Sequence, residues 1–243
     1  MSGYSASAAR ETRSGALHAE DGGTLAQAAF RALRSDIIRG VRPPAERLRI
    51  EKLKTIYDIG PTPLREALQM LVAEELVLTE GNRGFTVAPL DFDEFADLNV
   101  ARTAIELAAL RLSLQNGDNE WEAGVVAAGY LMKKHDAALT LGKAGVPEEW
   151  ERANAAFHTA IVAACGSKWL LKSRAGLYDQ CARYRLASVY QRIGRRDLSA
   201  EHAAIAEAAL ARDVELACAL TEEHFERTAS ALPNAQPTRV RHC

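Results

Sequence analysis

The hydrophobic pattern of this chain changes character at Pro89, and this change constrains the fold more than any other feature. Over residues 91–231, apolar residues recur at helical spacing, without the alternation typical of strands. Over residues 24–90, short helical stripes give way to short extended runs. We therefore expect a mainly α protein with a mixed N-terminal domain and an all-helical second domain. The ends should form a disordered arm, rich in Ser, Ala and Gly, at 1–23 and a loose tail at 232–243.

Three helical stripes and a hairpin pattern follow one another in the N-terminal domain. The predicted helices span residues 25–39, 50–57 and a segment from Pro61 onward, and the predicted strands span 77–80 and 85–88. The two strands enclose the loop Gly81-Asn82-Arg83-Gly84, a composition that suits a hairpin. Such an order is typical of a winged helix-turn-helix but also of a small structural domain. Spacing alone does not separate the two.

Capping signals divide the second domain into helices. Asp91 and Glu94 form a potential capping box, and Asn116-Gly117 ends the helix that they open, which should run through Ser113. Further stop signals follow the later helical stripes at comparable intervals. We expect a bundle of six helices.

The composition is that of a folded protein without membrane spans. The 243 residues are 48% hydrophobic, which is enough for two cores. No apolar run reaches the ~20 residues of a membrane span, and the N-terminus lacks a secretory apolar stretch. Four cysteines, mostly within helical patterns, indicate free thiols, so we expect a cytoplasmic location. Over residues 24–90, ten Lys and Arg against eight Asp and Glu make the charge balance too even to indicate nucleic acid by itself.

Three of the six histidines occupy positions on the predicted bundle helices at which they can meet. Asn154 lies four residues before His158, so the two share a helix face. His202 and His224 flank the helix joint at 212/213 by ten and eleven residues. At about 1.5 Å per residue, these offsets place both imidazoles at nearly the same height in an antiparallel pair. The set would suit zinc or nickel, although each histidine could instead be satisfied separately within the core.

Short tracts along the chain carry a family resemblance that covers about residues 25–230. The N-terminal tracts resemble the winged helix of GntR-type bacterial transcription regulators, and the later tracts resemble the FCD effector domain of the FadR subfamily. The resemblance implies a homodimeric regulator, most often a repressor, that binds operator DNA, senses a small organic acid and is not an enzyme. The tracts are Glu46-Arg47-Leu48, Thr62-Pro63-Leu64-Arg65-Glu66-Ala67-Leu68, Asn82-Arg83-Gly84-Phe85-Thr86-Val87, Asn154-Ala155-Ala156-Phe157-His158, Glu201-His202, Ala211-Arg212-Asp213 and His224.

The resemblance also implies which residues contact DNA. In this family the third helix enters the major groove, and the wing contacts the backbone or the minor groove. The family usually has Ser or Thr followed by Arg where this chain has Gly60 and Pro61, so its operator should differ from the family consensus. Without the resemblance, the arginine of the third helix would be interpreted as a solvated surface residue. The implied contacts are Thr62 and Arg65 on the third helix and Asn82, Arg83 and Gly84 in the wing.

Metal and effector residues are implied in the same way. The family's metal ligands are usually one Asp and three His, and here Asn154 takes the place of Asp, which predicts weaker metal binding. Arg102 matches a family arginine that clamps the effector's carboxylate, whereas its spacing alone favours a surface pair with Glu106. Gly60, together with the residues from Pro63 to Leu68, is most similar to the CsiR branch, which implies a short dicarboxylate such as glutarate.

Two other function classes remain open from the residues alone. A helical-bundle metalloenzyme acting on a small carboxylate could activate water at an open metal position. No Glu, Asp or Cys is placed by the sequence as an obvious general base, and the wing would have no role. A protein-interaction module would leave the matched heights of the histidines unexplained.

Overall fold

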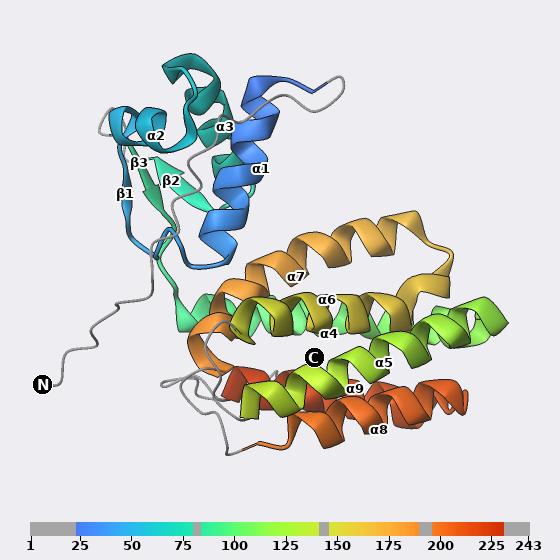
Figure 1. Ribbon diagram of the computed structural model, residues 1–243. Coiled ribbons are helices and arrows are strands. Elements are labelled where there is room, and N and C mark those ends of the chain that lie inside the picture. Colours follow the sequence, from blue (N-terminus) through green and yellow to red (C-terminus); the bar gives the residue numbers. More distant parts are fainter. Residues whose placement is uncertain (1–22, 80–83, 141–145, 190–195, 231–243) are drawn as a thin grey trace, which may run out of the picture. The chain divides into compact units, whose positions relative to one another are not determined.

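A computed structural model describes residues 23–79, 84–140, 146–189 and 196–230 (Figure 1). It divides into two compact units, Met1–Pro89 and Leu90–Cys243, each with its own hydrophobic core. The predicted arm, except for Gly23, and the predicted tail lie outside the described residues. None of the helices in the described ranges is long and apolar enough to cross a membrane.

The N-terminal unit combines three helices with a small antiparallel sheet. Its elements are α1 (Leu25–Ile38), β1 (Arg47–Leu48), α2 (Ile50–Tyr57), α3 (Pro61–Ala73), β2 (Val77–Thr79) and β3 (Phe85–Val87). The strand order is β1-β3-β2, and Val77 pairs with Val87 as the predicted hairpin requires. β1 was not predicted, because a strand of two residues shows no alternation and depends on β3 for its hydrogen bonds.

Local sequence explains where these helices begin and end. Thr24 and Gln27 form a capping box at the start of α1, and Gly40 follows the helix at a φ of 71°. α3 begins at Pro61, where the missing N–H costs no intrahelical hydrogen bond. The fully buried Leu64 and Leu68 of α3 belong to the core that this helix shares with α1. This packing leaves the opposite face of α3 exposed.

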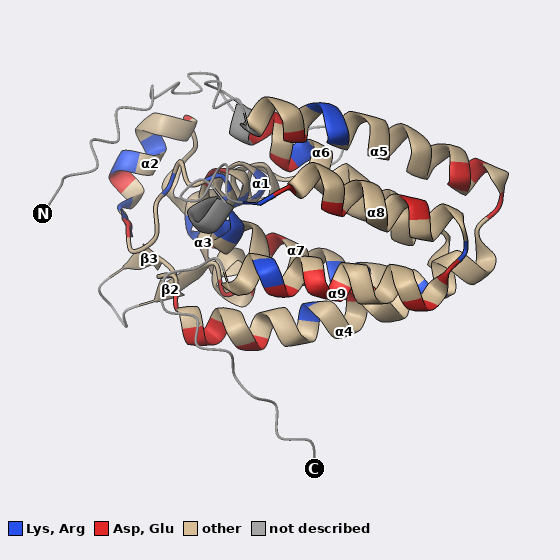
Figure 2. Ribbon diagram, turned by 90° about the horizontal axis from the view of Figure 1, so that it is seen from below, with Lys and Arg blue, Asp and Glu red and all other residues tan. Residues whose placement is uncertain are grey.

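The second unit consists of helices, as expected from the periodicity. The described residues form α4 (Phe92–Asn116), α5 (Asn119–Thr140), α6 (Val146–Val162), a 3₁₀ turn (Ala163–Cys165), α7 (Lys168–Val189), α8 (Leu198–Leu210) and α9 (Val214–Ser230). Asp91 caps α4 by accepting hydrogen bonds from the N–H groups of Asp93 and Glu94, which carry the first acidic side chains of that helix (Figure 2). α4 ends at Asn116, one turn later than predicted.

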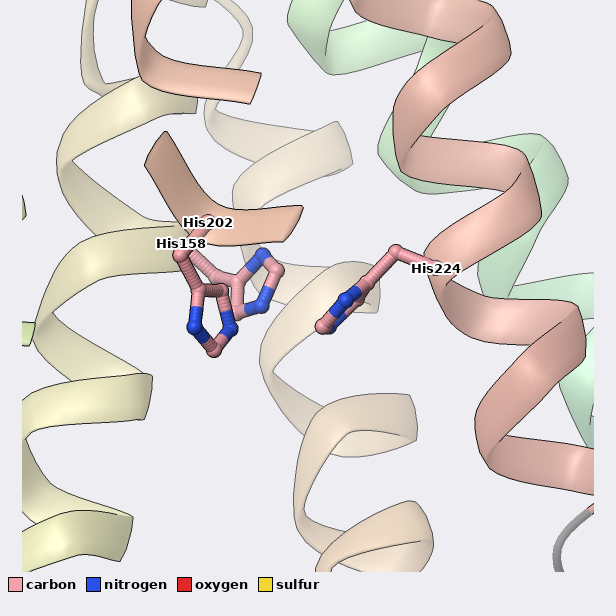
Figure 3. A group of neighbouring side chains, drawn as sticks. All are labelled: His158, His202 and His224. Atoms are coloured by element: carbon pink, nitrogen blue, oxygen red, sulfur yellow. The ribbon is translucent and has the colours of Figure 1, made fainter. Parts of the chain in front are cut away.

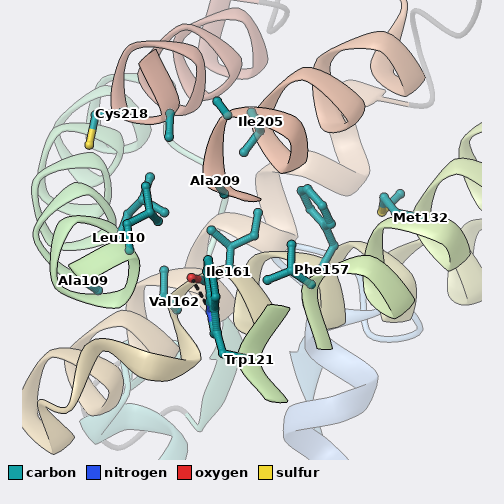
Figure 4. Close-up of a cluster of buried hydrophobic side chains, with 14 of the residues drawn as sticks. Ala109, Leu110, Trp121, Met132, Phe157, Ile161, Val162, Ile205, Ala209 and Cys218 are labelled. Atoms are coloured by element: carbon teal, nitrogen blue, oxygen red, sulfur yellow. Dashed lines mark hydrogen bonds between the residues drawn. The ribbon is translucent and has the colours of Figure 1, made fainter. Parts of the chain in front are cut away.

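The bundle core and one arginine hold the ends of the helices together. Trp121 of α5 lies in this core and donates a hydrogen bond to the carbonyl oxygen of Ile161 at 3.2 Å (Figure 4). Arg212, at the joint of α8 and α9, donates to the carbonyl oxygens of Leu114 and Gly117 at 2.8 Å each. These carbonyls belong to the C-terminal end of α4, which would otherwise lack partners. The tract that contains Arg212 therefore serves the fold.

Candidate effector site and DNA-binding surface

Three histidines from three helices meet inside the bundle. His158 comes from α6, His202 from α8 and His224 from α9, and Figure 3 shows their rings turned toward one another. Their nearest ligand atoms all lie within 4.8 Å of one another. All three side chains are buried. The structure therefore brings together the three histidines that the sequence placed at matching heights.

Carboxylates determine which nitrogen of two rings carries the hydrogen. Nδ1 of His202 lies 2.8 Å from Oδ2 of Asp136, and Nδ1 of His224 lies 2.8 Å from Oε2 of Glu201. An ionised carboxylate only accepts hydrogen bonds, so each Nδ1 carries the hydrogen and each Nε2 keeps a lone pair. Nη2 of Arg196 also lies 3.1 Å from Nδ1 of His224, but it donates to Glu201 and to the carbonyl oxygen of His224 instead. Metal-binding histidines usually have such a carboxylate behind them. Neither carboxylate was predicted from the sequence.

The electrostatic environment keeps His158 and His224 neutral. Burial lowers the pKa of His158 well below its usual range, and His224, His202, Arg102 and Arg174 add to this effect. Burial also lowers the pKa of His224 to about 3, against the opposing effect of its hydrogen bond to Glu201. A neutral imidazole is the form that binds a metal. His158 and His224 are therefore in the form that binds a metal at neutral pH.

The donor atoms fit a divalent transition metal. Nε2 of His158 and Nε2 of His202 are buried and have no hydrogen-bond partner among the described residues. Unpartnered buried nitrogens of this kind are costly unless a ligand satisfies them. Asn154 lies one turn before His158 on α6, and its amide nitrogen donates to the Tyr178 hydroxyl at 2.8 Å. Because the nitrogen is used in this way, the amide oxygen is the Asn154 atom available to a metal.

Arg102 of α4 is buried beside the histidines. Its guanidinium carbon lies 3.6 Å from the centroid of the Phe225 ring, and that ring is 5.5 Å from the ring of His158. Only 4% of Arg102 is exposed, and its Nε has no hydrogen-bond partner among the described residues. Burial lowers the pKa of Arg102. A buried cation in this position is suited to bind an anion.

The surface pair of Arg102 with Glu106, which spacing alone favoured, is not formed. Glu106 is buried and accepts two hydrogen bonds from Arg174 of α7, at 2.7 Å from Nε and 3.0 Å from Nη2. This bidentate geometry is stronger than a flexible pair along one helix. The sequence interpretation was wrong because it considered only partners on α4.

A second buried arginine is also paired. Arg185 of α7 donates to both carboxylate oxygens of Glu151, at distances of 2.9 to 3.2 Å. Burial lowers the pKa of Arg185, but the charge and hydrogen bonds of Glu151, together with Tyr178 and Cys181, outweigh this effect, so the pKa is raised. The ring of Tyr178 lies beside both Arg185 and Arg102. Its centroid is 4.6 Å from the guanidinium carbon of Arg185 and 5.6 Å from that of Arg102. Spacing could not reveal these pairs, because their members lie on different helices.

In the N-terminal unit, the implied DNA contacts lie on the exposed side of α3. Thr62 and Arg65 are both exposed, whereas Leu64 and Leu68 on the core side of α3 are buried. Gly84 is exposed at a φ of 114°, a conformation that favours glycine. Two further predicted contacts, Asn82 and Arg83, lie outside the described residues.

Comparison with known proteins decides the family. Residues 25–87 match the family described as bacterial regulatory proteins, gntR family, and residues 97–227 match the FCD domain. The chain belongs to the GntR family. Its FCD domain assigns this GntR protein to the FadR-like subfamily, in agreement with the resemblance seen in the sequence. GntR proteins of this kind are DNA-binding transcription regulators and not enzymes.

Individual relatives agree with this assignment. The chain is 39% identical over 209 residues to the uncharacterised HTH-type transcriptional regulator BphR of Paraburkholderia xenovorans, covering 86% of this chain and 85% of the relative. It is 39% identical over 200 residues to the HTH-type transcriptional repressor GlaR of Escherichia coli, covering 81% and 90%. The structure of E. coli McbR/YncC has a TM-score of 0.71 at 20% identity, covering 85% and 96%, and so shares the fold.

Proposed function

We propose that this GntR-family regulator is a homodimeric repressor whose affinity for its operator is lowered by a small dicarboxylic acid, such as glutarate. The acid binds inside the FCD bundle, between Arg102 and a divalent metal held by His158, His202, His224 and Asn154. The observation that carries the proposal is the buried charge of Arg102, for which no described carboxylate lies within ion-pair distance.

A charge count supports an acid with two carboxylates. The buried Arg174 and Arg185 are neutralised by Glu106 and Glu151, so their net contribution is small. Arg102 keeps its positive charge, His158 and His224 are neutral, and the Asn154 amide carries no charge. Zinc or nickel would add two positive charges and a Lewis-acidic position for an oxygen of the acid. Buried Asp136 offsets one of these three positive charges. A dianion would compensate the remaining two, whereas a neutral ligand would compensate none.

The DNA-binding half of the proposal follows from α3 and from the family. The exposed face of α3, with Thr62 and Arg65, would enter the major groove, and a dimer would bind two half-sites. The E. coli relative GlaR is a repressor, and this supports repression, rather than activation, by this protein. The acid must bind more tightly to the conformation that does not bind DNA, and the operator must weaken acid binding by the same factor.

Operator affinity, measured with and without glutarate and related acids on the zinc-loaded protein, tests the proposal. Wild-type protein should lose affinity when the acid is added. Arg102→Ala should bind the operator equally well without acid and should show no response to it. Arg111→Ala, which removes an exposed arginine from the same helix, should respond as the wild type does. A wild type that responds to no organic acid would disprove the sensor, and a responsive Arg102→Ala would disprove only the clamp.

A further inference from the structure

A buried carboxylate joins the proposed metal site to a tryptophan. Oδ1 of Asp136 accepts a hydrogen bond from the indole N–H of Trp150 at 2.8 Å, and Oδ2 lies 2.8 Å from Nδ1 of His202. All three side chains are at most 2% exposed. They come from α5, α6 and α8, so three helices contribute to one chain of hydrogen bonds. A carboxylate this deeply buried is costly unless both of its oxygens are hydrogen-bonded.

The tryptophan lies on the same helix face as two of the proposed ligands. Trp150, Asn154 and His158 follow one another at intervals of four residues on α6. The indole can only donate, so it orients Asp136 with one oxygen toward the tryptophan and the other toward His202. This second oxygen requires a hydrogen on Nδ1 of His202, and Nε2 then holds the lone pair.

We propose that Asp136, held by Trp150, is a positioning residue that maintains His202 in the tautomer with a free Nε2, the only tautomer in which that nitrogen can bind a metal. This inference rests on the proposed metal site and assigns a role to two residues outside it. Nε2 of His202 has no hydrogen-bond partner among the described residues, so its lone pair is available to a metal. His202 contributes one of the three ring nitrogens that lie within 4.8 Å of one another.

Replacing Asp136 with Asn should reveal this role, because an amide cannot satisfy both neighbours. If the amide oxygen faces the indole N–H of Trp150, the amide NH₂ faces Nδ1 of His202. That nitrogen must then accept, and the hydrogen moves to Nε2, which blocks it as a ligand. If the amide is reversed, two donors face each other at Trp150. The carboxylate of Asp136 avoids both problems, because both of its oxygens accept. Asp and Asn have nearly the same shape, so Asp136→Asn alters the tautomer of His202 more than the packing around it.

Zinc affinity, measured by calorimetry on the full-length protein, tests the proposal. Asp136→Asn should weaken zinc binding about 10- to 100-fold. Trp150→Phe alone should have a smaller effect. In the double variant, the amide oxygen is free to face His202, and zinc affinity should partly recover relative to Asp136→Asn. Asp97→Asn, the same change at an exposed position on α4, should bind zinc as the wild type does.

The tautomer can be measured without any metal. In ¹⁵N-histidine NMR spectra of the metal-free wild type, His202, assigned by comparison with His202→Gln, should carry its hydrogen on Nδ1. A hydrogen on Nε2 would overturn the proposal, as would unchanged zinc affinity in a folded Asp136→Asn protein. If wild-type protein binds neither zinc nor nickel, the metal site of the proposed function fails, while the NMR spectrum still tests the positioning role. The two failures are therefore distinguishable, even if Asp136→Asn does not fold.

Discussion

The two units bury very different side chains. Among the described residues of the N-terminal unit, Arg42 is the one buried polar or charged residue, and the core around it is apolar. The described part of the FCD bundle buries fifteen polar or charged residues, including arginines, acids and the three histidines. Buried polar groups reduce stability unless they are paired. Their number in the bundle therefore indicates a functional role.

The proposed function accounts for this difference, because each unit would bind its partner in a different place. The N-terminal unit would meet DNA with the exposed face of α3, so its interior can be optimised for packing alone. The bundle would enclose a small ligand, so its binding groups would have to lie inside. Changes at functional residues should therefore spare stability in the first unit and reduce it in the second.

The largest expected effect concerns the ion pair between Glu106 and Arg174. Glu106→Ala would leave Arg174 charged and buried without its partner, and we expect a loss of about 3–5 kcal/mol in the free energy of unfolding. Urea denaturation followed by circular dichroism measures this loss. Glu223→Ala, in the exposed pair with Arg227, should cause almost no change. Equal losses in both variants would contradict the contrast between buried and exposed charges.

The next effect separates the two units by their response to zinc. Zinc at a hundredfold excess over its dissociation constant should stabilise the folded bundle by about 2.7 kcal/mol. Hydrogen exchange followed by mass spectrometry should show added protection in α6, α8 and α9, and no change in α1 and α3. His202→Ala should abolish the protection. Protection spread evenly over both units would show that the metal acts elsewhere.

The smallest effect on stability is expected at Arg65. Arg65→Ala should weaken specific operator binding by about 1–3 kcal/mol if this residue contacts a base, while the free energy of unfolding changes by less than about 0.5 kcal/mol. Gel-shift titrations at fixed salt measure the first quantity. Arg65→Lys keeps the charge but loses the planar fork of the guanidinium, so it should behave like Arg65→Ala at a base contact. Full affinity in the lysine variant would indicate a phosphate contact, and full affinity in both would remove Arg65 from the interface.

Local patterns in the sequence determined the helices and the hairpin. Helical periodicity predicted α1, α3 and the six helices of the bundle, because each apolar face is encoded within its own segment. The same periodicity placed His202 and His224 at matching heights, since an antiparallel helix pair has a constant rise per residue. The sequence alone also carried the family resemblance, which comparison with known proteins confirmed.

The partners of the buried polar side chains were decided only by the tertiary structure. Asp136 contacts His202, and Glu106 contacts Arg174, across distances of 66 and 68 residues along the chain. Spacing indicates which residues share a face of one helix, but it does not indicate which other helix packs against that face. For this reason the sequence could suggest the pairing of Arg102 with Glu106, four residues away, and could not show that α7 supplies a better partner. Hydrophobic periodicity is a local property, whereas the pairing of buried charges depends on how the helices are assembled.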